Sequence, residues 1–225
     1  PQLYDLSAMS DDDYFLNEKN PEILFTYGYY LVSYYAWLAK CNFPISDDLQ
    51  ALYGDNDWRL THFFYKRGAV YTAQKSETSG TTGIYGYAFR TAEAYLNRAE
   101  AYAEKGDKDK ALQDLKTIRE KRLKVYEEVQ AVAKEDVIRR VREERRRELS
   151  FEFHRWFDLR RWDRPRIEHT FTPDIKQPDV VEKYVLEKDD PAYTLPLPRS
   201  VVEYDPTLVD NPRPQRENQN VTGEN

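Results

Sequence analysis

The sequence predicts a mainly α-helical protein with long loops and an extended C-terminal tail, and three observations lead to this fold class. Residues 90–165 carry apolar side chains at steps of three and four, the period of a helix that buries one face. Residues 1–89 are irregular, rich in aromatic side chains and interrupted by turn signals. Residues 166–225 are spaced by prolines, which interrupt both helices and central strands. We therefore divide a single domain, 1–225, into a loop-rich aromatic segment, a helical scaffold and an extended tail.

The composition is that of a folded protein with a highly charged surface, with 40% apolar and 33% charged residues. A formal net charge of −6 argues against nucleic-acid binding, which needs a positive surface. The single cysteine, Cys41, excludes an internal disulfide framework and a cysteine metal cluster. The three histidines, His62, His154 and His169, show no ligand spacing. We therefore expect neither a metal nor another cofactor.

Aromatic side chains are concentrated in one part of the first segment. Five rings occur within nine residues: Tyr29, Tyr30, Tyr34, Tyr35 and Trp37. A regular helix would bury about half of them on one face, and the others would stay in water unless they contact a partner. Sugar rings offer flat C–H faces that stack on such side chains. We predict these five residues as ligand contacts, while core packing remains the alternative for any single ring.

The scaffold begins with a predicted pair of helices. The first, over residues 92–105, ends at Gly106 and Asp107, and the second follows at once. Small residues at Ala99 and Ala111 let the two helices approach closely. The expected contact between them consists of Tyr95, Ala99, Tyr102, Ala111 and Leu115. This order of aromatic and small residues is typical of a tetratricopeptide-type pair. One pair cannot bury its own face, and we expect the helices that cover it to lie in a missing N-terminal half.

A third long helix is predicted from about Asp136 to Trp162, where Pro165 ends it. Its apolar stripe includes Val137, Val141 and Leu149. The tail that follows is expected to be extended and held by four apolar anchors: Tyr193, Leu195, Leu197 and Leu208.

Charges of both signs alternate along this third helix. Glu144, Glu148 and Glu152 fall on one stripe and are interleaved with arginines. Such spacing favours ion pairs within a helix and between helices, and arginine suits bidentate contacts with carboxylates. We therefore interpret the three glutamates, together with Arg145 and Arg155, as structural ion pairs rather than as a nucleic-acid or metal site.

Catalytic patterns are not evident in the sequence. It contains no nucleophile elbow, no glycine-rich phosphate loop and no His-Glu-x-x-His motif. No two carboxylates are singled out as an acid and base for glycoside hydrolysis. We expect a binding protein and not an enzyme, with no catalytic residues.

Several segments resemble the SusD/RagB family. In the helix pair they are RTAEAYLNRAEA at 90–101 and the GD at 106–107 that leads into the second helix. In the third helix they are ERRRELSFE at 144–152 and RWFDLRRW at 155–162, and in the tail they are YTLPLP at 193–198 and DNP at 210–212. Asp57-Trp58-Arg59 also resembles a family element. Two details depart from the family pattern, because Arg213 follows Asn211-Pro212 where glycine is usual, and the usual glycine near His154 is absent.

The resemblance implies the C-terminal half of a SusD-like α-helical protein that binds nutrients without chemistry. Family members are lipid-anchored, through an N-terminal cysteine not in this chain, on the outer face of the outer membrane. They deliver glycans, or sometimes peptides, to a SusC-like TonB-dependent transporter, and their ligand residues lie in variable loops. The implied partners are this transporter, the ligand and the missing N-terminal half. The alternative is a tetratricopeptide-type adaptor that binds a protein partner through its helix faces.

Overall fold

The computed structural model describes residues 2–10, 13–26, 44–68, 70–76, 88–171, 180–211 and 219–222. The chain divides into two compact units, residues 1–155 and residues 156–225. The predicted ligand residues Tyr29, Tyr30, Tyr34, Tyr35 and Trp37 lie outside the described residues.

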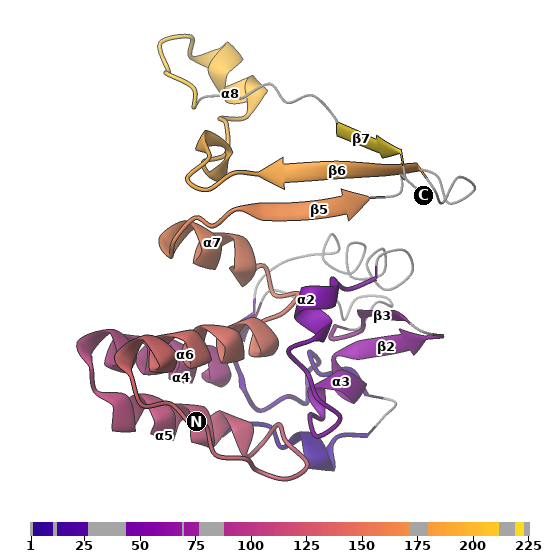
Figure 1. Cartoon of the computed structure of the whole chain (residues 1–225), viewed down its shortest axis with the longest axis vertical. Coiled ribbons are helices and arrows are strands. Elements are labelled where there is room, and N and C mark those ends of the chain that lie inside the picture. Colours follow the sequence, from indigo (N-terminus) through magenta and orange to yellow (C-terminus); the bar gives the residue numbers. More distant parts are fainter. Residues whose placement is uncertain are drawn as a thin grey trace. The chain divides into compact units, whose positions relative to one another are not determined.

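Most of the regular structure is helical (Figure 1). The helices are η1 (Leu6–Ala8), α2 (Asp47–Gln50), α3 (Arg59–His62), α4 (Thr91–Lys105), α5 (Lys108–Arg119), α6 (Lys134–Glu148), α7 (His154–Arg161), η3 (Pro191–Tyr193) and α8 (Arg199–Tyr204). The strands are β1 (Ile23–Thr26), β2 (Phe64–Arg67), β3 (Val70–Ala73), β4 (Ala88–Arg90), β5 (Ile167–Phe171), β6 (Val180–Leu186) and β7 (Gln219–Thr222). The predicted fold class is confirmed.

The predicted helix pair is formed by α4 and α5. Gly106 ends α4 with a φ of 83°, a left-handed conformation that suits glycine, and its N–H donates to the carbonyl of Ala103 at 3.0 Å. The Arg98 guanidinium reaches across to Asp114, with Nη2 2.7 Å from Oδ1. Ala99 and Ala111 are fully buried between the helices, which explains why small residues occupy these positions.

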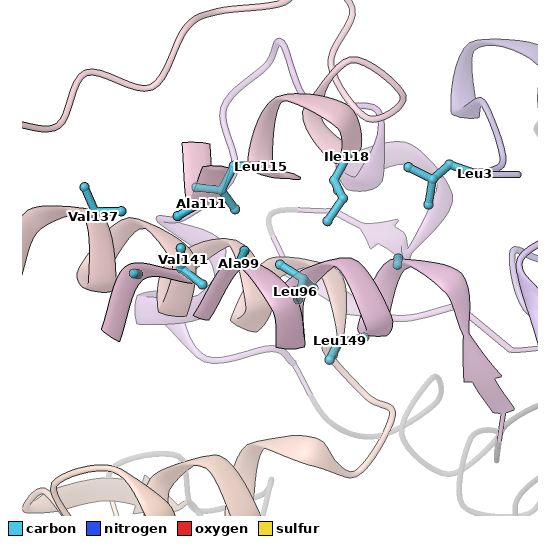
Figure 2. Packing of buried hydrophobic residues seen from close by; sticks show 11 residues of the cluster. Leu3, Leu96, Ala99, Ala111, Leu115, Ile118, Val137, Val141 and Leu149 are labelled. Atoms are coloured by element: carbon cyan, nitrogen blue, oxygen red, sulfur yellow. The ribbon is translucent and has the colours of Figure 1, made fainter. Parts of the chain in front are cut away.

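The helix that covers this pair lies in the chain itself. Figure 2 shows Val137 and Val141 of α6 in one apolar cluster with Leu96, Ala99 and Leu115. Our expectation that a missing N-terminal half is needed to cover the pair was therefore wrong for this face. The sequence concealed the role of α6, because its charged side chains outnumber its apolar ones.

The third predicted helix was wrong in one respect, because it is two helices. Between α6 and α7 the backbone has positive φ at Phe151 (61°) and Phe153 (65°), which no α-helix allows. The break turns Glu152 inward, where Arg90 Nη2 lies 2.7 Å from its Oε1. The charge and aromatic pattern continues across the break and so did not reveal it.

A second apolar core holds the loop-rich part of the first unit. It contains Leu6, Met9, Phe15, Leu16, Ile45, Leu49, Tyr53, Phe63 and Phe64. The hairpin β2–β3 packs beside it, with Phe64 opposite Ala73. The separate pair β1–β4 is also antiparallel and leads directly into α4.

The second unit contains the antiparallel sheet β5–β6–β7, so the extended tail includes regular strands (Figure 1). Tyr193 is buried, stacks on Trp156 at 5.2 Å between ring centroids, and donates its hydroxyl to the carbonyl of Pro165. Leu195 and Leu208 were expected as anchors but are exposed, at 63% and 40%. Tyr193 therefore anchors the tail, because its ring finds an aromatic partner and its hydroxyl an acceptor.

Replacing Ala99 by leucine should overpack the contact between α4 and α5. We expect the Ala99→Leu change to lower the free energy of unfolding by about 1–3 kcal/mol, measured by urea denaturation. Ala101→Leu is the matched control, because Ala101 lies on the exposed side of the same helix. Equal stability of the two variants would contradict the close packing described for Ala99.

Candidate functional site

A network of buried charges lies at the centre of the first unit. The carboxylate of Glu148 is fully buried and contacts three arginines: Arg59 Nη1 at 3.2 Å, Arg90 Nη1 at 3.1 Å and Arg122 Nε at 2.9 Å. The arginines come from α3, from the end of β4 and from the loop after α5. One side chain of α6 thus holds three distant segments together.

Four further acids complete this charge network. Glu22 pairs with Arg90 and Arg122, and Asp57 pairs with Arg59 at 2.7 Å. Glu144 contacts Arg59 at 2.7 Å, and the partly buried Arg119 and Arg147 reach its other oxygen. Glu152 binds Arg90 and Lys75, whose ammonium also donates to the carbonyl oxygens of Glu148 and Ser150.

The pKa shifts show which charge states the network favours. Burial alone would raise the pKa of Glu144, but Arg59, Arg147 and Arg119 outweigh it and lower that pKa to about 2. Burial is also the largest single influence on the pKa values of Glu148 and Glu152, but their cationic partners together outweigh it and lower both pKa values: Arg122, Arg90 and Arg59 for Glu148, and Arg90 and Lys75 for Glu152. Burial lowers the pKa of Lys75 to about 8, although Glu152 opposes this shift. A general acid needs a raised carboxyl pKa, so these glutamates are suited to a scaffold and not to proton transfer.

The ion-pair role that we predicted for Arg145 and Arg155 stays a prediction. Arg145 is buried and donates to the Asn97 side chain at 2.7 Å, which ties α6 to α4. Arg155 is exposed at the end of the first unit. The sequence analysis missed Arg90, Arg122 and Lys75, because they lie outside the charge-rich run and nothing in their spacing indicates a common partner.

A surface pocket of about 350 Å³ lies beside the loop-rich core. Its lining residues are Asp47, Gln50, Ala51, Tyr53, Asp55, Leu60 and Tyr71. The Ile45 N–H donates to the Tyr71 carbonyl at 2.8 Å, and this bond holds the start of α2 beside β3. The Tyr53 hydroxyl donates to the Arg147 carbonyl at 2.8 Å, so the pocket wall is fixed to α6.

The chemistry of this pocket suits a ligand with many hydroxyl groups. Tyr71 contributes a partly exposed ring, and Lys66 lies across the hairpin with its Nζ 5.7 Å from the ring centroid. The Asp47 and Asp55 carboxylates are exposed at the rim and can accept hydrogen bonds from hydroxyls. Rings supply flat apolar contact and polar groups fix orientation, as in small-ligand sites generally.

Exposed aromatic side chains also occur next to the segment that holds the predicted ligand residues. Phe25 of β1 and Phe89 of β4 are 58% and 51% exposed, and their rings stack at 6.2 Å. Strand β1 ends at Thr26, directly before residues 27–43. The pair follows from the antiparallel register, which places Phe25 opposite Phe89. The sequence analysis did not predict either residue as exposed.

The residues that the structure describes include neither a metal-ligand cluster nor a helix suited to cross a membrane. No three His, Cys, Asp or Glu side chains gather there in a way that could hold a metal ion. None of the helices described is both long and apolar enough to span a bilayer.

The charge network gives a direct stability test. Glu148→Gln should leave three buried arginines without full compensation and lower the free energy of unfolding by about 3–5 kcal/mol at pH 7. Glu143→Gln is the control, because Glu143 is partly exposed and pairs closely with the solvent-exposed side chains of Arg139 and Arg140, with only a longer contact of 3.8 Å to Arg147, and should matter by about 1 kcal/mol or less.

The same comparison has a defined pH dependence. A carboxylate whose folded pKa is lowered stabilises the protein fully above its unfolded value, 4.5 for Glu148, and loses this contribution as the pH falls. The difference between wild type and Glu148→Gln should therefore be constant above about pH 5 and shrink below it. A difference that grows in acid would contradict the network as described.

The chain is similar to known proteins of one kind. The model of the SusD family matches residues 23–213. A proposed sugar-binding protein of Bacteroides vulgatus matches in structure with a TM-score of 0.58 and 23% identity, over 79% of this chain and 41% of that one. A SusD-like carbohydrate binding protein of the same species matches with a TM-score of 0.51 and 19% identity, over 78% and 42%.

The chain thus spans less than half the length of both solved structures. No curated protein matches it. The two structural matches support the fold, and the family match covers most of the residues, including the charged segment and the helix pair. On this evidence the chain belongs to the SusD family.

Proposed function

We propose that this chain is part of a non-catalytic nutrient-binding protein that holds glycans at the cell surface. Membership of the SusD family supports this proposal, as does the name of the SusD-like carbohydrate binding protein of Bacteroides vulgatus. The observation that carries it is the pocket between α2 and β3, where the Tyr71 ring and two rim carboxylates offer the two contacts that a sugar needs.

A binding role is favoured over an enzymatic one by the state of the carboxylates. The buried Glu144, Glu148 and Glu152 are already bound by arginines and have lowered pKa values. Retaining and inverting glycosidases both need a protonated acid beside a second carboxylate. The lowered pKa values of Glu144, Glu148 and Glu152 are opposite to this requirement.

The adaptor alternative is less well supported. A tetratricopeptide-type adaptor would offer an apolar helix face to its partner. None of the large hydrophobic residues that are exposed in the described chain lies in α4, α5 or α6. The exposed rings lie instead in strands, turns and short helices, outside the three long helices whose faces an adaptor would use.

The family membership extends the proposal to a partner and a location. We place the protein on the outer face of the outer membrane, held by a lipid on a cysteine outside this chain. A SusC-like TonB-dependent transporter would receive the ligand, which is a glycan or a peptide. The N-terminal half of the same protein would complete the binding surface.

Binding can be tested by native gel electrophoresis in gels containing starch, xylan, galactan or α-mannan. We expect at least one of these polysaccharides to slow the migration of the protein. Tyr71→Ala should bind that polysaccharide at least tenfold more weakly, since an aromatic side chain that becomes buried on binding contributes about 2 kcal/mol or more. Tyr204→Ala is the control, because Tyr204 is 92% exposed in α8 of the second unit. Equal loss in both variants, or none in Tyr71→Ala, would contradict the pocket assignment.

The aromatic segment is a second predicted contact. Trp37→Ala and the double change Tyr29→Ala/Tyr30→Ala should each weaken binding of the retained polysaccharide, measured by calorimetry on variants whose unfolding midpoint is unchanged. Tyr34 and Tyr35 belong to the same predicted surface. Unchanged affinity in both variants would show that this segment packs in the core and does not contact ligand.

A further inference from the structure

The pocket between α2 and β3 has negative charge in its lining. Two of the residues that line it are acids, Asp47 in the first turn of α2 and Asp55 in the turn before α3, and both are exposed. Among the described residues that line the pocket, none is a lysine, arginine or histidine. Exposed carboxylates are ionised at neutral pH, and a hollow lined by charges of one sign concentrates their field.

The acids next to these two in the sequence are already paired with arginines. Asp48 Oδ2 lies 2.6 Å from Arg146 Nη2, and Asp57 Oδ2 lies 2.7 Å from Arg59 Nη2. Within the parts of the chain that the structure describes, no ion pair involves Asp47 or Asp55. The charges of the neighbouring acids are thus balanced within the fold, whereas those of the two lining acids are available to a ligand.

An exposed cation lies beside the pocket without lining it. Lys66 of β2 is opposite Tyr71 of β3 in the hairpin register, and its Nζ is 5.7 Å from the centroid of the Tyr71 ring. This one ammonium can balance one of the two aspartate charges, and the other stays uncompensated. The field that a ligand meets on the Tyr71 ring is therefore negative.

We propose that the pocket selects saccharides by charge, accepting neutral and amino sugars and excluding units that carry a carboxylate or a sulfate. The proposal rests on the glycan-binding function proposed above and names the substrate class of the same site. An ionised carboxylate only accepts hydrogen bonds, so Asp47 and Asp55 can bind the hydroxyls of a sugar but offer nothing to an anion. An acidic unit on the Tyr71 ring would meet their repulsion, whereas an ammonium would gain a charge-assisted hydrogen bond.

Three derivatives of one polysaccharide test this selection. The polysaccharide among starch, xylan, galactan and α-mannan that retains the wild type is prepared in carboxymethyl, aminoethyl and hydroxyethyl forms of equal substitution. The hydroxyethyl form is the neutral control of similar size. Calorimetry in about 0.15 M NaCl screens charges beyond about 8 Å, so that charges far from the pocket contribute little.

The wild type should discriminate between the three forms. We expect the carboxymethyl form to bind at least about fivefold more weakly than the hydroxyethyl form, and the aminoethyl form at least about fivefold more tightly. Both ratios should fall below about twofold in 1 M NaCl, where the screening length is about 3 Å.

A pair of double variants locates the charges responsible. Asp47→Asn/Asp55→Asn keeps an acceptor oxygen at both positions and removes both charges, so both affinity ratios should fall below about twofold. Glu18→Gln/Glu128→Gln is the matched control, because it removes the same number of charges from exposed acids that do not line the pocket. The control should discriminate as the wild type does.

Each other outcome has a defined meaning. Equal wild-type affinity for the carboxymethyl and hydroxyethyl forms overturns the charge selection and leaves the proposed function intact. Tighter binding of the carboxymethyl form also overturns it and would assign the dominant charge to Lys66. Discrimination that survives in Asp47→Asn/Asp55→Asn, or that is lost equally in the control, shows that the net charge of the whole protein decides and overturns the role of the pocket. Retention by none of the four native polysaccharides overturns the glycan-binding function, and this inference with it.

Discussion

The fold of the first unit depends on the burial of one carboxylate, that of Glu148, among three arginines. A buried carboxylate is tolerated only when its lone pairs are bound by cations and hydrogen-bond donors. Arg59, Arg90 and Arg122 satisfy this condition, but they come from segments far apart in the sequence. The chain can bury α6 only if α3, the β4–α4 junction and the loop after α5 arrive together. Glu148 therefore constrains the arrangement of these elements more than any single apolar contact does.

Buried ion pairs seldom add net stability relative to an apolar core, because the cost of removing charges from water offsets their attraction. Lys75 illustrates the cost, since burial lowers its pKa to about 8 even beside Glu152. What the network supplies is selectivity among arrangements. Apolar contacts between α4 and α5 tolerate small shifts, whereas Arg90 must meet Glu22, Glu148 and Glu152 at once. A misplaced segment would leave a buried charge unpaired, and this would lower the free energy of unfolding by about 3–5 kcal/mol.

Features encoded within a short stretch of the sequence could be predicted, whereas contacts between distant segments could not. The α4–α5 pair was predictable, because its periodicity and Gly106 lie within thirty residues of each other. The stripe of Glu144, Glu148 and Glu152 was visible for the same reason. Their partners Arg90 and Lys75 were not, since contacts over 58 to 77 residues leave no periodic trace. The break at Phe151 and Phe153 was hidden because phenylalanine is not a turn residue. The pocket was hidden because the backbone contacts that bring α2 beside β3 join segments far apart in the sequence.

The same constraint separates the scaffold from the proposed binding pocket. Asp47, Asp55 and Tyr71 make no described contact with the charge network, so changes there leave its pairings intact. The turn between α6 and α7 is different, because Glu152 fixes its backbone. There the network determines which residues face outward and in what conformation. The positive φ values of Phe151 and Phe153 are thus a consequence of where Glu152 must lie to meet Arg90 and Lys75.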